Sequence, residues 1–405
     1  MSNPTHRVRV LFISSDSSST TGVGRSFVDL VTHLDLTRIE PHIVVPWPGA
    51  DEANILVELR AAGIEPIVRH LEYWIPARRA WGARHLFHWV RTLKDRIWPL
   101  AALIERTGTD VVYTSTLPCI DGALAALITR RPHVWHVQEV IKGHPGFRSY
   151  LPWPLLRSLA WRLASRVLVP SLYLRDAIKN TANDTKVHIV HNGIDTGGFQ
   201  HNARDKKAIL SSLGLPSDCR MVVQVGTLEE VKSQEVLVRA VARLNADFAD
   251  TMFVFVGTEN PEYADRLKSL IHELGFHGRF RFLGPRSDVA SILAASECLV
   301  LTSRFETFGR VLVEAMATGL PVVATRCGGP EEIVQDGITG YLIDIGDDLA
   351  LAHCIDTLLA NPDAAKQMGA AGRLRAAKDF SISEYARNIQ DILVNVHTLH
   401  QESSA

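Results

Sequence analysis

The chain has 405 residues, enough for two or three domains, and its 43 basic residues nearly balance its 44 acidic residues. This balance gives no general attraction to nucleic acid, so we expect no nucleic-acid partner. The sequence contains no run of about 18 uncharged apolar residues, so we expect no membrane-spanning helix.

The N-terminus and the cysteines indicate a cytoplasmic protein. Residues 1–15 lead straight into a strand-like segment and carry no cleavable signal pattern. The cysteines are scattered and form no CxxC pair, which is typical of free thiols in a reducing compartment; they are Cys119, Cys219, Cys298, Cys327 and Cys354.

Short apolar runs rich in Val, Ile and Phe alternate with helix-like patterns along the chain. A first set of expected strands covers residues 8–13, 42–45, 111–113, 134–137, 167–169 and 188–190. A second set covers residues 221–225, 252–256, 280–283, 298–301 and 322–324, and helices are expected between them at 233–244, 263–274 and 289–295. Strands that alternate with helices and are apolar on both faces favour parallel sheets covered by helices.

The two sets of strands predict an α/β protein with two Rossmann-like domains. Gly, Asn and Asp cluster in residues 192–208, a composition typical of a connecting loop. We therefore place the first domain at residues 1–195 and the second at residues 196–380, followed by a final segment at residues 381–405.

Aromatic and basic residues concentrate in the first domain. All eight tryptophans lie in the first 161 residues, and residues 71–100 combine several of them with six Arg or Lys against two acids. Such a helix can pack Trp into the core and expose Arg, which is our default interpretation. It can also lie on an anionic membrane surface or grip a lipid-linked substrate, which we keep as a hypothesis.

A glycine-containing loop follows the first strand. Gly22 and Gly24 precede a helix-like pattern at residues 26–34, so backbone amides and a helix N-terminus could approach an anion. The third glycine of the dinucleotide fingerprint would fall on Phe27, which argues against NAD binding. A tight turn without a ligand is the alternative interpretation.

The second domain opens with the strand and loop at residues 222–240. Lys232 stands just before a helix that should begin near Ser233 or Gln234. An ammonium group there is well placed to pair with a diphosphate, because ligands of α/β domains bind at the carboxyl ends of the strands.

Two glutamates, Glu306 and Glu314, flank Phe308 and Gly309 after the strand at residues 298–301. A helix should begin at Phe308 or Gly309, so its first amides are unpaired and the glycine allows a ligand to approach. One carboxylate near a phosphate and one farther along the helix suit a ligand with both phosphates and hydroxyls. The pattern predicts a sugar nucleotide.

The order of these motifs resembles the retaining GT-B glycosyltransferases of glycosyltransferase family 4. The resemblance rests on the E-x7-E element from Glu306 to Glu314, on EAMATGLPVVAT and GGPEEIVQDGITGYLI after it, and on HNGID, VGTLEEVK and FLGPRSDV before it. It spans nearly the whole chain and is weakest over residues 45–130. It implies two Rossmann-like domains with parallel sheets facing across a cleft, the first binding the acceptor and the second the donor. It also implies a final helix that crosses back onto the first domain.

The resemblance implies roles for individual residues. Lys232 would carry the charge of the donor diphosphate, Glu314 would hold the ribose hydroxyls, and Glu306 would contact the transferred sugar. Gly24 would bring its amide to the distal phosphate or the sugar. The assisting backbone amides would be those of Phe308, Gly309, Arg310 and Val311.

Two positions fit the family pattern less simply. His136 is the implied counterpart of the family's active-site histidine, but Gln138 is an alternative for that role and His136 could be an ordinary strand residue. Thr227 stands in the donor site where relatives often carry an arginine, and it offers a hydroxyl but no charge. Neutralisation of the diphosphate would then rest on helix amides and on Lys232, with Arg310 or Arg25 as further cations.

The implied reaction moves a sugar from a nucleotide-diphosphate-sugar donor to an acceptor hydroxyl with retention of configuration. Lys232 and preorganised amides would stabilise the charge that grows on the leaving diphosphate, which would take the acceptor proton. No Asp-x-Asp pair follows a strand, so we expect no obligatory metal and no cofactor. UDP is the first expectation for the donor and GDP the second. The acceptor could be a glycan, a lipid-linked sugar or a small molecule.

Two other functions remain open at this point. A sugar-nucleotide epimerase on a similar scaffold would need no acceptor and would convert the donor alone. A non-catalytic sugar-nucleotide-binding module, suggested by Thr227, would bind nucleotide without transferring sugar.

Overall fold

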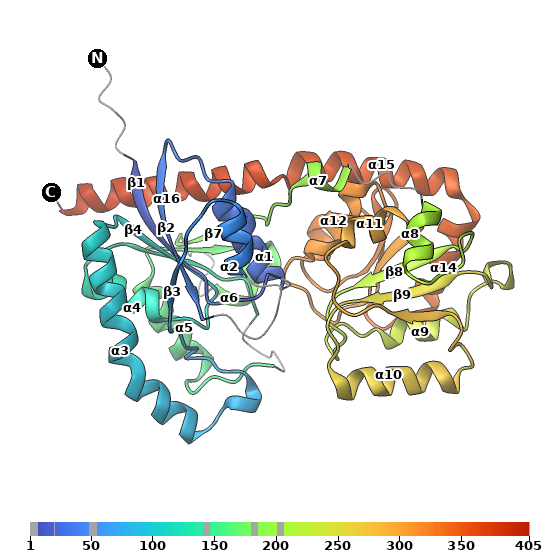
Figure 1. The fold of residues 1–405 in the computed structure, drawn as a ribbon, viewed down its shortest axis with the longest axis horizontal. Coiled ribbons are helices and arrows are strands. Elements are labelled where there is room, and N and C mark those ends of the chain that lie inside the picture. The colour runs from blue at the N-terminus through green and yellow to red at the C-terminus, as the bar shows by residue number, and fades with distance from the viewer. Residues whose placement is uncertain are drawn as a thin grey trace, which may run out of the picture. The chain divides into compact units, whose positions relative to one another are not determined.

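The computed structural model describes residues 7–19, 21–47, 55–140, 146–179, 185–200 and 206–404. The chain forms two compact units (Figure 1), and each is described by itself. The first unit comprises the chain up to Gly193 together with the segment from Ile382 onward, and the second is Ile194–Ser381. Every helix within the described residues is too short or too polar to span a bilayer.

The described part of the first unit contains a seven-stranded parallel sheet in the order β3-β2-β1-β4-β5-β6-β7. The order reverses between β1 and β4, and ligands of open α/β sheets bind beside the carboxyl ends of the strands at such a reversal. The strands are β1 (Val8–Ile13), β2 (Ile39–Pro46), β3 (Ile67–Arg69), β4 (Val111–Ser115), β5 (His133–His136), β6 (Arg166–Val169) and β7 (Val187–Ile189).

Helices cover both faces of this sheet. Along β1, Val10 and Phe12 pack in a core with α1, α2 and α16, while Leu11 and Ile13 pack in a core with α3 and α4. This alternation explains why the strand is apolar on both faces. The helices are α1 (Gly22–Thr32), α2 (Ile55–Ala61), α3 (Ala83–Thr107), α4 (Asp121–Ile128), α5 (Trp153–Leu163), α6 (Leu172–Ile178) and α16 (Ile382–Ser404), with a 3₁₀ turn η1 (Arg78–Ala80).

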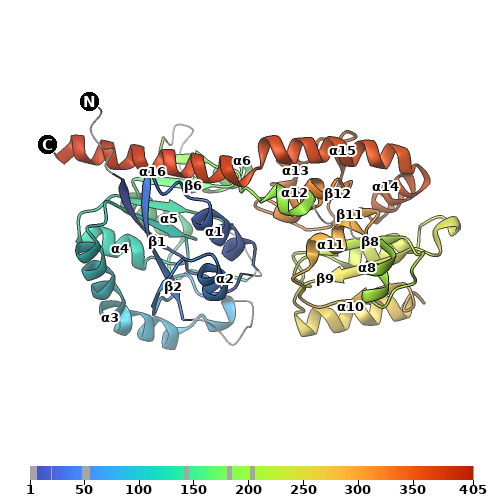
Figure 2. The same ribbon diagram turned by 45° about the horizontal axis from the view of Figure 1, so that its top comes forward.

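The C-terminal helix α16 is an integral part of the first unit. Figure 2 shows it beside α1 and the strands, and Tyr385, Ile389 and Leu393 are buried in the core that also contains Phe12. The side-chain Oε1 of Gln390 accepts a hydrogen bond from the backbone N–H of Asp35 at 2.7 Å. Helix α16 therefore completes the core of the first unit.

The second unit contains a six-stranded parallel sheet, in the described residues, with the order β10-β9-β8-β11-β12-β13. Its order reverses between β8 and β11. The strands are β8 (Met221–Val225), β9 (Met252–Val256), β10 (Phe280–Phe282), β11 (Cys298–Leu301), β12 (Val322–Thr325) and β13 (Gly340–Ile343). The helices are α7 (Thr196–Gln200), α8 (Lys206–Ser212), α9 (Glu235–Val241), α10 (Pro261–Glu273), α11 (Val289–Ala294), α12 (Arg310–Thr318), α13 (Pro330–Ile333), α14 (Asp348–Ala360) and α15 (Pro362–Asp379), with a 3₁₀ turn η2 (Ala246–Phe248).

The predicted alternation of strands and helices is confirmed, because each expected strand is present in one of two parallel sheets. The short edge strands β3 and β13 were not expected from the sequence. The five cysteines are free, as predicted. The helix predicted at residues 26–34 begins earlier, at Gly22, so that both glycines of the first loop lie inside α1.

Candidate active site

The first part of the site is the turn after β8. Gly226 and Gly257 have φ values of 147° and 145°, and a Cβ on Gly257 would lie 2.2 Å from the carbonyl oxygen of Gly226. Glycine is therefore needed where the ends of β8 and β9 meet. Thr227 follows directly. Its hydroxyl accepts a hydrogen bond from that of Thr258 at 3.3 Å, and its carbonyl accepts one from the side chain of Gln234 at 2.9 Å.

Lys232 is held in place by its backbone. Its N–H donates to the carbonyl of Glu229 at 2.9 Å, and its carbonyl accepts hydrogen bonds from Thr302 Oγ1 at 2.9 Å and Gln224 Nε2 at 3.3 Å. Gln224 belongs to β8, and Thr302 directly follows β11. The next residue, Ser233, has φ 46°, a left-handed conformation that is costly for a non-glycine residue and is common at functional sites. These contacts fix Lys232 at the point where the order of the second sheet reverses.

Glu306 meets Lys232 from the loop after β11. Lys232 Nζ lies 2.5 Å from Glu306 Oε2, and their side chains are 24% and 17% exposed. The backbone of Glu306 is bonded to the segment after β12, because its N–H donates to the carbonyl of Cys327 and its carbonyl accepts from the N–H of Gly329. A Cβ on Gly329 would lie 2.4 Å from the backbone of Phe308. The GGPEE motif thus supports the loop that carries Glu306.

The charges in this cluster act on one another. Burial disfavours the charged form of Lys232, but attraction to Glu306 and the hydrogen bond with it outweigh burial, so the pKa of Lys232 lies above its ordinary value. Burial raises the pKa of Glu229 more than the nearby Lys232 lowers it. Lys232 therefore stays positively charged at neutral pH.

The N-terminus of α12 lies beside this pair. Gly309 is its N-cap residue, with φ 97°, and a Cβ there would lie 3.4 Å from Glu306 Cγ. The helix has no acidic residue in its first turn. Arg310, the first residue of the helix, places its Nε 2.8 Å from Oε1 of Glu314 one turn later, with side chains 11% and 16% exposed. The unpaired amides that begin a helix attract an anion to such a place.

The structure brings most of the predicted donor-site residues of the second unit to one edge of its sheet. Lys232 pairs with Glu306, and Gly309 lies beside Glu306. Lys232 also lies beside Gly226, the glycine that precedes Thr227. Phe308 is 2% exposed and its ring lies 5.8 Å from that of Phe380, so only its backbone is placed for a ligand. Val311 is partly buried and packs against the same core.

Gly24 lies in the first turn of α1 and is bonded to the cap of that helix. Its N–H donates a hydrogen bond to Thr21 Oγ1 at 2.9 Å as part of the cap of α1. A Cβ on Gly24 would lie 1.9 Å from the carbonyl oxygen of Ser18. This close approach of the loop requires a glycine at position 24, and the predicted contact of its amide with the donor stays a prediction.

His136 is a core residue in the structure, and its predicted contact with the donor sugar stays a prediction. Its side chain is 0% exposed, its Nδ1 lies 2.5 Å from the hydroxyl of Tyr113, and its ring lies 6.2 Å from that of Tyr385 in α16. Burial lowers the pKa of His136 to about 3, so the ring is neutral. The alternative residue, Gln138, is also buried, and its Oε1 accepts a hydrogen bond from Asn192 at 3.4 Å.

The sequence analysis missed a second polar cluster, at the point where the order of the first sheet reverses. Thr116, just after β4, has φ 74°, and its hydroxyl lies 2.5 Å from that of Ser15. Glu139, after β5, has a buried Oε2 without a hydrogen-bond partner among the described residues. Burial raises the pKa of Glu139 to about 8, and the nearby Asp16 adds to the rise. The position of Glu139 shortly after a strand is the sequence feature that could have predicted this cluster.

Comparison with known proteins identifies the family. Residues 20–197 match the family model Glycosyltransferase Family 4, and residues 205–375 match Glycosyl transferases group 1. A D-inositol 3-phosphate glycosyltransferase of Mycobacterium sp. (strain KMS) is 33% identical over 393 residues, which cover 88% of this chain and 78% of the relative. The chain belongs to glycosyltransferase family 4.

Two other relatives of this family-4 glycosyltransferase align over shorter segments. The N-acetyl-alpha-D-glucosaminyl L-malate synthase of Bacillus anthracis is 31% identical over 211 residues, covering 51% of this chain. A D-inositol 3-phosphate glycosyltransferase of Nocardioides sp. is 34% identical over 229 residues, covering 52% of it. These matches span about half the length of the two relatives, 54% and 49% respectively.

Solved structures share the fold of this glycosyltransferase. Anabaena HepE in complex with UDP-glucose has a TM-score of 0.79 at 24% identity, with 96% of this chain and 100% of that chain covered. A glycosyltransferase from Rickettsia africae has a TM-score of 0.78 at 20% identity, with 96% and 98% covered. The predicted GT-B type of fold, two α/β units with parallel sheets, is confirmed.

Proposed function

We propose that this chain transfers a sugar from a nucleoside diphosphate sugar, with UDP as the first choice of nucleotide, to an acceptor hydroxyl. The observation that carries the proposal is the ion pair of Lys232 and Glu306 beside the N-terminus of α12, at the carboxyl ends of β8 and β11. A cation and unpaired helix amides at this edge suit a diphosphate. The likeness to HepE, whose structure contains UDP-glucose, supports the choice of UDP.

The mechanism follows from the charge that develops on the leaving group. As the bond between the sugar and the diphosphate breaks, negative charge grows on the phosphate oxygens, and Lys232 with the first amides of α12 stabilises it. Glu306 contacts the transferred sugar, and Glu314 accepts hydrogen bonds from the ribose. The acceptor attacks on the face from which the diphosphate leaves, and the diphosphate takes its proton, so the configuration is retained. The charge of Lys232 replaces a metal ion in this scheme, so a chelator should leave the rate unchanged.

A binding and transfer experiment tests the proposal. UDP-, GDP- and ADP-sugars are screened by thermal shift, because a ligand of the folded state raises the melting temperature by mass action. The donors that bind are then incubated with D-inositol 3-phosphate, L-malate and glucose, and the products are analysed by NMR for linkage and anomeric configuration. We expect a glycoside with the donor's configuration.

The same experiment separates the other two functions. An epimeric nucleotide sugar formed from the donor alone would indicate an epimerase. If the protein binds a nucleotide sugar but transfers no sugar, even after lipid-linked acceptors are added to the panel, it is a binding module. No binding of any nucleotide sugar would contradict the proposal itself.

We further propose that helix α3 places the first unit on an anionic membrane. Its Phe87, Val90 and Trp98 are 70%, 57% and 55% exposed. Exposed Arg84, Arg91 and Lys94 stand seven and three residues apart on the same helix, spacings that place them on one face of it. Exposed aromatic and basic side chains along one helix suit a surface of anionic lipid.

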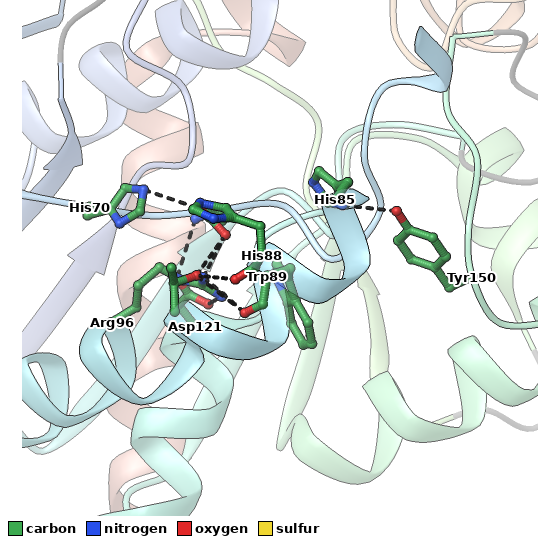
Figure 3. A network of polar contacts seen from close by, with 9 residues as sticks. His70, His85, His88, Trp89, Arg96, Asp121 and Tyr150 are labelled. Atoms are coloured by element: carbon green, nitrogen blue, oxygen red, sulfur yellow. Dashed lines mark hydrogen bonds and ion pairs between the residues drawn. The ribbon is translucent and has the colours of Figure 1, made fainter. Parts of the chain in front are cut away.

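A largely buried network of polar contacts holds the middle of this helix. Arg96, whose side chain is 0% exposed, donates to Glu72 at 2.7 Å and to Asp121 at 2.9 Å, and His88 Nε2 lies 3.0 Å from Glu72 (Figure 3). At this turn the default interpretation of the sequence, with Trp in the core and Arg exposed, is wrong, because Arg96 is buried and Trp98 is exposed. The network holds the helix while Phe87, Val90 and Trp98 face outward.

Vesicle flotation tests the membrane proposal. The wild-type protein should float with phosphatidylglycerol vesicles at low salt and less at high salt, and it should not float with phosphatidylcholine vesicles. Changing Phe87→Ser and Trp98→Ser together should abolish flotation, while Leu374→Ser, at a 74% exposed residue of α15, should not. Equal flotation of the two variants would contradict a role for α3.

A further inference from the structure

Two cations at the candidate donor site are each paired with a carboxylate. Lys232 lies 2.5 Å from Glu306, and Arg310 lies 2.8 Å from Glu314. All four side chains are mostly buried, the most exposed being Lys232 at 24%. The two pairs are joined through the cap of α12, because Gly309 precedes Arg310 and a Cβ on Gly309 would lie 3.4 Å from Glu306 Cγ.

The place of Arg310 is unfavourable for the helix itself. It is the first residue of α12, and the N-terminus of a helix carries partial positive charge, which repels a cation. The pair with Glu314 also has the weaker order for residues four apart, with the base before the acid. Its side chain is only 11% exposed, so water does little to solvate the charge. An anion bound at the N-terminus would remove each of these costs.

The charge that a donor brings calls for a second cation. A nucleoside diphosphate sugar carries two negative charges on its phosphates, and Lys232 supplies one positive charge. Thr227, beside Lys232, has a hydroxyl but no charge. A guanidinium group binds phosphate with two parallel hydrogen bonds, which makes Arg310 suited to the remaining charge.

We propose that Arg310 binds the donor diphosphate by exchanging its carboxylate partner, Glu314, for a phosphate oxygen. The released carboxylate of Glu314 then accepts hydrogen bonds from the ribose hydroxyls. Binding of the phosphates and binding of the ribose are thereby coupled, because separating Arg310 from Glu314 frees the first for the phosphates and the second for the ribose. This inference rests on the proposed function and adds to it a second phosphate ligand and a link between the two halves of the donor.

Calorimetry with three probes tests the exchange, using UDP, uridine and inorganic pyrophosphate. In Arg310→Gln, the affinity for UDP should fall about 10- to 100-fold, as expected for a lost hydrogen bond between charged groups. The affinity for uridine should stay the same or rise, because Glu314 is no longer occupied by Arg310. The matched control is Arg326→Gln, which breaks the 2.6 Å pair with Asp336 and should change neither affinity.

The second variant gives responses of opposite sign. In Glu314→Gln, pyrophosphate should bind several-fold more tightly, because Arg310 no longer has to leave a carboxylate, whereas uridine should bind more weakly. Unchanged UDP affinity in Arg310→Gln, or an equal loss for UDP and uridine, would overturn the inference while leaving the proposed function in place. Failure of the wild-type protein to bind UDP or GDP would instead overturn the proposed function.

Discussion

At the scale of single residues, the proposed binding of the donor diphosphate depends most on Lys232. Its backbone is fixed by three hydrogen bonds, to the Glu229 carbonyl and from the side chains of Thr302 and Gln224, none of which involves its own side chain. Its charge is secured by Glu306, which holds the pKa of Lys232 above its ordinary value against the effect of burial. We therefore test Lys232 by measuring UDP affinity rather than stability.

Lys232→Ala should weaken UDP binding about 10- to 100-fold, because a hydrogen bond between charged groups contributes roughly 1.5–3 kcal/mol. Isothermal calorimetry measures the change. The control is Lys268→Ala, which breaks an exposed 2.8 Å pair with Glu259 in the same unit. If both variants bind UDP equally, Lys232 does not contact the phosphates.

Glu139 should make the stability of the protein depend on pH. Its folded-state pKa of about 8 lies above the value of an exposed glutamate, so the folded state binds a proton more tightly between the two values. The free energy of unfolding should therefore fall as pH rises through this range, by on the order of 2 kcal/mol once the partial exposure of the residue is allowed for.

Glu139→Gln should remove this dependence. Urea unfolding at about pH 5 and about pH 8 should show the variant to be more stable than the wild type at the higher pH and similar to it at the lower. A pH dependence that persists in the variant would assign the titration to another group. Exposed Glu262→Gln, in the second unit, serves as the control.

Residues with a role in a motif were predictable, and residues defined by burial were not. Lys232 and Glu306 stand at strand ends in a recognisable order, and the structure places them in contact. His136 also stands at a strand end, but α16, more than 200 residues later, covers it with Tyr385. The sequence analysis had no measure of that burial.

At the scale of elements, the beginning of α12 decides how a ligand can approach. Gly309 caps the helix with φ 97°, and a Cβ there would lie 3.1 Å from Leu312 Cδ1 and 3.4 Å from Glu306 Cγ. The helix was predicted to begin at Phe308 or Gly309 and begins at Arg310. The helix α1 differs more, because Thr21 caps it ahead of both glycines of its loop.

Gly309→Ala should lower both stability and UDP affinity. The left-handed backbone costs a residue with a Cβ roughly 1–2 kcal/mol. The new methyl group would crowd Leu312 Cδ1 at 3.1 Å and touch Glu306 Cγ at 3.4 Å. The control is Gly337→Ala, which has φ 73° but nothing within 4 Å of the added Cβ, so it should lower stability alone. Equal loss of UDP affinity in both variants would show that backbone strain lowers the affinity, and not the position of Gly309 at the candidate site.

Elements with a strong apolar run were predicted correctly, and those with a weak one were missed. The central strands β8, β9 and β11 are nearly continuous runs of Val, Phe, Leu and Met, as buried parallel strands are. The edge strand β3 has three residues, all only partly buried, and β13 begins with a glycine. Short edge strands bury less surface and therefore need less apolar sequence.

At the scale of the whole molecule, the fold of the first unit depends on the end of the chain. Helix α16 contributes Tyr385, Ile389 and Leu393 to the core beneath β1 and β4. The resemblance to family 4 implied this return of the chain, which local patterns do not encode. The predicted cleft between the two domains stays a prediction.

Ile389→Ala should destabilise the first unit by about 2–5 kcal/mol, the usual cost of a cavity in place of a fully buried isoleucine. Thermal unfolding followed by circular dichroism measures the effect, with the exposed Asn395→Ala as control. The affinity for UDP should not change at a temperature where the variant is folded, because the candidate donor site lies in the second unit. A matching loss of UDP affinity would place part of the nucleotide site in the first unit.

The central claim is that Lys232, Glu306 and the first amides of α12 hold the diphosphate of a sugar nucleotide. A crystal structure of the protein with UDP-glucose tests it most directly. The account predicts phosphate oxygens at about 2.7–3.2 Å from Lys232 Nζ and from backbone N–H groups at the start of α12. A nucleotide bound elsewhere, or bound with its phosphates out of reach of Lys232, would contradict it.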